Sequence, residues 1–149
     1  EVLTQRYLKS IREEGSMAYS VGAQGEASYG SKEEYLIYVS CPVKPAKADS
    51  ALYLIDLGLK EVAKDGCTKE ELDKIKQFNL KNYADNQKVN SYWASLIRSK
   101  TLWNKDLHTG YEAVINGLSS DDLKNFVNNV VLKKLNRLTI TMLPASLKE

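Results

Sequence analysis

Residues 11–21 read IREEGSMAYSV, and they decide the fold because the sequence pattern changes from helix to strand within them. On their N-terminal side, residues 2–14 carry an apolar stripe at helical spacing. On their C-terminal side, residues 17–29 alternate between two faces, one of which holds small side chains. The sequence therefore predicts a helix with Gly15 as its C-cap and a strand that follows. The helical stripe consists of Leu3, Tyr7, Leu8 and Ile11.

A second strand is expected directly after the first. Gly30 and Ser31 are turn residues, and residues 34–43 are rich in aromatic and β-branched side chains. Since a short turn joins the two segments, they are predicted to pair as an antiparallel hairpin.

The rest of the chain is mainly helical in its periodicity. Thr68 with Glu71 and Ser119 with Asp122 have the spacing of capping boxes, which begin helices. The expected helices cover 47–65, 69–87, 89–101 and 107–116, and another begins after Ser119. Residues 135–143 alternate once more and predict a closing strand.

This order of helix, hairpin, helices and strand predicts the α+β class, with a mostly antiparallel sheet and helices packed on one face. The 149 residues are enough for one modest core or for part of a larger domain. We interpret residues 1–149 as a single, partial domain.

The charge balance excludes several classes of partner. The chain has 21 basic and 19 acidic residues, a net charge of +2, which is too even to indicate nucleic acid or an anionic membrane surface as a partner. A nucleic-acid adaptor would therefore show only weak, salt-sensitive binding. No apolar run reaches the roughly 18 residues of a membrane-spanning helix.

Few residues could carry chemistry by themselves. His108 is the single histidine, and we interpret it as an exposed or capping side chain. Cys41 and Cys67 are expected to be free thiols, because the helix between them would separate them by roughly 27 Å. Tyr92 and Trp93 fit a core better than a site, and no spacing predicts a metal ligand set.

One pair stands out within the opening stretch, Arg12 and Tyr19. It resembles the R-E-x-x-G-x-x-Y-type signature of the pitrilysin/insulinase (M16) family of zinc metallopeptidases. The resemblance covers essentially the whole chain, because further segments recur in family order. These are the hairpin, the junction DGCTKEELDKIK at 65–76, the pair Tyr92–Trp93, the segment LSSDDL at 118–123 and a closing strand at 138–143.

The resemblance implies a metallohydrolase-like fold, here a C-terminal, non-zinc-binding domain that is truncated on its N-terminal side. In that family, zinc is bound by another domain through H-x-x-E-H, and the later domain contributes an Arg and a Tyr that hydrogen-bond the peptide. The expected substrate-binding residues are thus Arg12 and Tyr19, and the chain has no catalytic residue and no cofactor of its own. The parent would be a zinc endopeptidase whose partners are a peptide and an N-terminal zinc-binding domain.

Alternatives remain open. The parent could be a non-catalytic binding or scaffolding member of the family. Considered alone, an Arg in a last helical turn is favoured by the helix dipole, and a Tyr that opens a strand has ordinary β-propensity. An open sheet edge could pair with a second copy of the chain. The compartment is undecided, an exported or periplasmic parent being one alternative.

Overall fold

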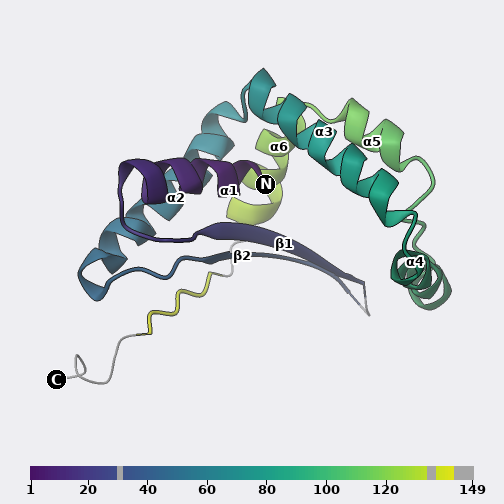
Figure 1. Cartoon of the computed structure of the whole chain (residues 1–149), viewed down its shortest axis with the longest axis horizontal. Helices are drawn as coiled ribbons and strands as arrows, with labels where there is room; N and C mark the ends of the chain where they lie inside the picture. The colour runs from purple at the N-terminus through teal and green to yellow at the C-terminus, as the bar shows by residue number, and fades with distance from the viewer. Residues whose placement is uncertain (30–31, 134–136, 143–149) are drawn as a thin grey trace.

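The structure is a computed structural model, and it describes residues 1–29, 32–133 and 137–142. Its helices lie on one side of a hairpin, with α4 beyond the hairpin's far end (Figure 1). No helix in the described ranges is both long and apolar enough to cross a membrane. The elements are α1 (Val2–Tyr7), η1 (Leu8–Glu14), β1 (Gly22–Tyr29), β2 (Glu33–Ser40), η2 (Pro45–Lys47), α2 (Ala48–Asp65), α3 (Lys69–Asn86), α4 (Asn90–Trp103), α5 (Tyr111–Gly117), α6 (Ser120–Phe126) and η3 (Val127–Leu132).

The predicted helix over 2–14 is confirmed as α1 followed by η1. η1 is π-helical, so its turns are wider than those of α1. The apolar stripe faces inward, because Tyr7 and Ile11 are fully buried and Leu3 and Leu8 are half-buried.

The hairpin is confirmed as an antiparallel pair, with Gly22 opposite Ser40 and Tyr29 opposite Glu33. The α+β class is therefore confirmed, although the sheet in the described part has two strands and helices predominate. The first strand begins later than predicted. Residues 17–21 contribute only an isolated bridge, between Ala18 and Val43. Ser16 interrupts the extended chain, because its φ of 47° lies in the left-handed region.

The closing strand expected at 135–143 is not formed where the structure describes it. Residues 137–142 belong to no strand, and 135, 136 and 143 lie outside the described residues. Leu138, Ile140 and Met142 are 82%, 73% and 90% exposed. Alternation alone does not make a strand, since a strand needs a neighbour to satisfy its backbone groups.

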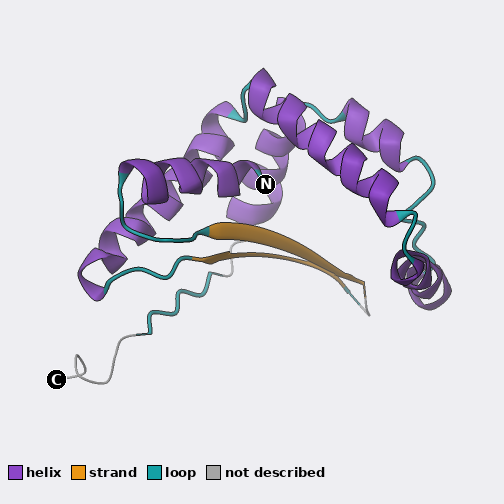
Figure 2. Ribbon diagram, viewed as in Figure 1, coloured by secondary structure: helices purple, strands orange, loops and turns teal. Residues whose placement is uncertain are grey.

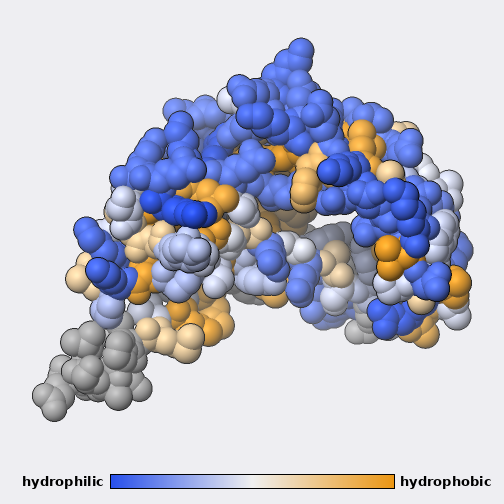
Figure 3. Space-filling model, viewed as in Figure 1, coloured by the Kyte–Doolittle hydropathy of each residue, from blue (hydrophilic) through white to orange (hydrophobic). Residues whose placement is uncertain are grey.

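Two buried clusters hold the helices and the hairpin together. One lies between the N-terminal helix, the hairpin and α2, and is centred on Tyr7, Ile11 and Val21. The other lies between α1, α2 and η3, and its buried members are Val2, Val62, Ala63, Cys67 and Val127. Leu3 packs against both clusters, so the N-terminal helix forms the centre of the fold. Hydrophilic residues cover the helices at the top of the view in Figure 3.

Both predicted capping boxes are confirmed. Thr68 accepts from the backbone N–H of Glu71, and Ser119 accepts from that of Asp122, with the reciprocal bonds also present. Cys41 and Cys67 are free, as expected. Because burial raises the pKa of the Cys41 thiol, this cysteine is a poor nucleophile at neutral pH.

Candidate functional site

The end of the N-terminal helix positions Arg12. Gly15 N–H donates to the Ser10 carbonyl at 3.0 Å, and Met17 N–H donates to the Ile11 carbonyl at 2.9 Å. These bonds satisfy carbonyl groups that a helix end leaves without partners. Arg12 therefore leaves the last turn from a fixed backbone, and its side chain is exposed.

Gly15 is the C-cap, as predicted, but for a reason other than a left-handed conformation. Its φ is −80°, which any residue adopts. A Cβ at this position would lie 2.8 Å from the Ser10 carbonyl oxygen and 3.0 Å from that of Ile11. Only glycine therefore allows this close approach. The residue in the left-handed conformation is instead Ser16. Ser16 is the fourth residue after Arg12, the position that glycine occupies in the R-E-x-x-G-x-x-Y signature.

Tyr19 follows this turn and is 87% exposed. The bridge between Ala18 and Val43 holds its backbone beside the segment that leaves β2. Figure 2 shows the two connecting loops at the same end of the hairpin. The Arg12 Cζ lies 5.5 Å from the centre of the Tyr19 ring, a cation–π distance. The structure thus brings together the two residues that the sequence singled out.

Arg12 and Tyr19 belong to the wall of an open hollow that the sequence did not reveal, which we call the Arg12 hollow. Its lining residues are Arg12, Ser16, Met17, Ala18, Tyr19, Pro42, Val43 and Lys44. Lys44 is the functional candidate that sequence reasoning missed. It precedes Pro45, which restricts Lys44 to an extended conformation, and its observed φ and ψ are −63° and 143°.

The polar side chains that line the Arg12 hollow, Arg12, Ser16, Tyr19 and Lys44, can all donate hydrogen bonds. Guanidinium and ammonium groups donate only, and a phenol can donate one hydrogen bond. Among the residues that the structure describes, no group of three His, Cys, Asp or Glu side chains is placed to hold a metal ion. Chemically, the site can bind carbonyl or carboxylate oxygens.

His108 lies elsewhere and is neither fully exposed nor a cap, which corrects the sequence interpretation. The hydroxyl groups of Tyr83 and Tyr92 lie 3.1 and 3.2 Å from its Nδ1. Trp93 packs against the same ring, and the Tyr111 ring stacks on Tyr83 at 4.5 Å. This aromatic cluster joins α3, α4 and α5. Tyr92 and Trp93 belong to this aromatic cluster and not to the buried core. The position of His108 in the cluster depends on the packing of three helices, which the local spacing of residues does not encode.

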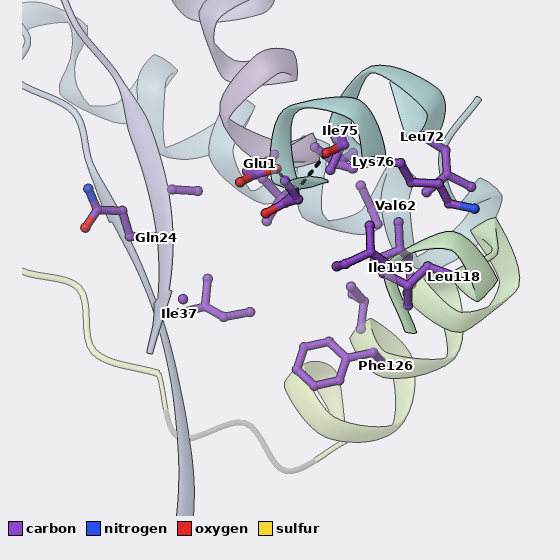
Figure 4. Close-up of a pocket in the computed structure, with 17 residues that line it drawn as sticks. Glu1, Gln24, Ile37, Val62, Leu72, Ile75, Lys76, Ile115, Leu118 and Phe126 are labelled. Atoms are coloured by element: carbon purple, nitrogen blue, oxygen red, sulfur yellow. Dashed lines mark hydrogen bonds between the residues drawn. The ribbon is translucent and has the colours of Figure 1, made fainter. Parts of the chain in front are cut away.

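A second cavity, of about 320 Å³, lies between the hairpin and the helices. Figure 4 shows Ile37 of β2 facing Val62, Ile115 and Phe126 across it. Glu1, Gln24, Lys76 and Asn79 supply its polar lining, and Asn79 donates to the Glu1 carboxylate at 2.8 Å. Its lining is otherwise mainly apolar, so we assign it no chemistry.

Comparison with known proteins identifies the fold. The sequence model described as the peptidase M16 inactive domain matches residues 1–79, which include every residue of the Arg12 hollow. The periplasmic protease PqqL from Escherichia coli superposes with a TM-score of 0.68 at 19% identity, over 85% of this chain and 14% of that chain. A protease from Helicobacter pylori superposes with a TM-score of 0.64 at 22% identity, over 82% and 30%. This chain thus spans less than a third of the length of either protease. A search of curated proteins found no match.

Proposed function

The chain belongs to the peptidase M16 inactive-domain family, and from this premise we propose that it is the substrate-binding portion of a zinc-dependent endopeptidase. Its substrates would be peptides or unfolded segments. Arg12 and Tyr19 would hydrogen-bond peptide carbonyl oxygens and stabilise negative charge that develops near the cleaved bond. The observation that carries this proposal is the contact of the Arg12 guanidinium with the exposed Tyr19 ring at the edge of an open hollow.

Zinc would be bound by another domain of the parent protein. The described residues of this chain do not fit a zinc site, because no three potential ligands meet. The domain would therefore contribute peptide binding and orientation, while the zinc domain would supply the activated water.

Substitutions in the full-length protein test the proposal. We expect Arg12→Ala and Tyr19→Phe each to lower kcat/KM for peptide hydrolysis by about 10- to 100-fold, because each removes a hydrogen bond worth about 1.5–3 kcal/mol. Zinc content, measured by metal analysis, should not change. The matched controls are Arg98→Ala on α4 and Tyr53→Phe on α2, which are both exposed and do not line the hollow. Hydrolysis at the wild-type rate in both hollow variants would refute the assignment. Peptide binding through Arg12 and Tyr19 without any hydrolysis would instead assign the parent to the non-catalytic members.

We propose a second copy of the chain as a further partner, which would pair with the open edge of the hairpin. In the described part of the chain, β1 and β2 each pair with one strand, so both outer edges are open. Leu36 and Tyr38 are exposed apolar side chains on β2. We expect light scattering to report a molar mass above that of the monomer, and Leu36→Lys to lower it, because a charge on an edge strand opposes pairing. A monomeric wild-type chain at high concentration would contradict this expectation.

A further inference from the structure

The Arg12 hollow contains two cations and no acid. Arg12 comes from η1, and Lys44 comes from the segment between β2 and α2. No Asp or Glu is among the residues that line the hollow. In the described part of the chain, neither cation forms an ion pair with a carboxylate, and the nearby Glu14 lies 4.0 Å from Lys9. The side chains that line the hollow therefore carry a net positive charge, which attracts an anion.

Different contacts position the Arg12 side chain and the Lys44 backbone. Arg12 is restrained by its contact with the Tyr19 ring, which leaves the N–H groups at the edge of the guanidinium free to donate. Lys44 is restrained at its backbone, since Pro45 fixes it as extended and its carbonyl accepts from Lys47 N–H at 2.8 Å. The bridge between Ala18 and Val43 ties the two segments together.

We propose that the Arg12 hollow binds a carboxylate of the peptide, with Lys44 as the residue that confers preference for it. This inference rests on the proposed function, since it names the class of substrate that the same site prefers. Backbone carbonyls need only the donors of Arg12 and Tyr19, whereas a carboxylate also gains from the point charge of Lys44. The carboxylate belongs either to an Asp or Glu side chain or to the C-terminus of the peptide.

Binding of matched peptides to the full-length protein tests the preference without requiring hydrolysis. The probes are short peptides that carry an uncharged fluorophore on the N-terminus and differ in one central residue, Glu or Gln, each with a free or an amidated C-terminus. By fluorescence anisotropy, we expect a peptide with a carboxylate to bind about fivefold more tightly than the uncharged peptide, and high salt to reduce this ratio. If the Glu side chain is the source, the amidated Glu peptide keeps the advantage. If the terminus is the source, only amidation removes it.

The variants separate this inference from the proposed function. Lys44→Gln should bring the ratio of affinities between the carboxylate peptides and the uncharged peptide close to one, and Lys44→Arg should retain the ratio. The exposed Lys81→Gln on α3 serves as control. Equal affinity for all four peptides, with Arg12→Ala still weakening each of them, would overturn the carboxylate site and leave the proposed function intact. If neither Arg12→Ala nor Tyr19→Phe weakens any peptide, the proposed function fails, and the inference fails with it.

Discussion

Replacing Tyr7 with alanine is expected to lower the free energy of unfolding by about 3–5 kcal/mol, because it leaves a large cavity in the centre of the fold. The Tyr7 side chain is 1% exposed and lies in the cluster between the N-terminal helix, the hairpin and α2. Its ring fills the space above Gly58, where an added Cβ would lie 2.7 Å from Tyr7 Cε1. Gly58 has no side chain that could turn into the cavity and fill it.

Two matched variants isolate the cause of this loss. Tyr7→Phe keeps the ring and removes only the hydrogen bond from the hydroxyl to the Ile55 carbonyl at 2.9 Å, so it should cost about 1 kcal/mol. Tyr19→Ala removes a ring that is 87% exposed, so its stability should stay within about 0.5 kcal/mol of wild type. Urea unfolding followed by circular dichroism measures all three. A Tyr7→Ala midpoint close to that of Tyr19→Ala would show that the cluster does not carry the fold.

Tyr7 and Tyr19 also show what could be predicted from the sequence. The helical stripe identified Tyr7 as a core residue, because periodicity of 3.6 residues is a local property of the chain. Both capping boxes were found for the same reason. The closing strand was predicted wrongly at 137–142 since alternation states which side chains share a face but does not supply the neighbouring strand.

The Arg12 hollow was predictable only in part. Arg12 and Tyr19 are seven residues apart and were found through resemblance to a family signature. Lys44 lies next to them only because Ala18 bridges to Val43, a contact between residues 25 positions apart. Its one local indication was Pro45, which fixes the backbone of Lys44 without indicating what the side chain faces.

The same limit applies to the ion pair between Arg6 and Glu71, which are 65 residues apart. Arg6 Nε and Nη2 donate to the two carboxylate oxygens of Glu71, each at 3.0 Å, and Nη2 also donates to the Gly66 carbonyl at 2.9 Å. Glu71 accepts a further bond from Thr68 N–H at 2.8 Å. One carboxylate thus anchors α1 to the junction between α2 and α3, a role that its capping-box spacing did not predict.

This geometry predicts loss of stability in acid. The hydrogen bond from Arg6 lowers the pKa of Glu71 from its ordinary value of 4.5 to about 2. A carboxyl group with a lowered pKa stabilises the folded state above its ordinary pKa, and this contribution is lost as pH falls through the folded-state pKa. Glu71 should therefore contribute its full stabilisation above about pH 5 and progressively less between pH 4.5 and 2. Hydrogen bonds also lower the pKa values of Asp106 and Asp122, so acid weakens the protein for several reasons.

Glu71→Gln isolates the part due to this pair. At pH 7 it should cost about 2 kcal/mol, less than for a fully buried pair because the Arg6 and Glu71 side chains are 20% and 23% exposed. The difference in unfolding free energy between wild type and Glu71→Gln should shrink towards zero as pH falls from 5 to 2, since protonated Glu71 also lacks the charge. Glu70→Gln is the matched control, because Glu70 is the exposed neighbour and, among the residues described, its ion pair is with Lys74, at 2.7 Å. A difference that stays constant across this pH range would mean that Glu71 acts through packing and not through its charge.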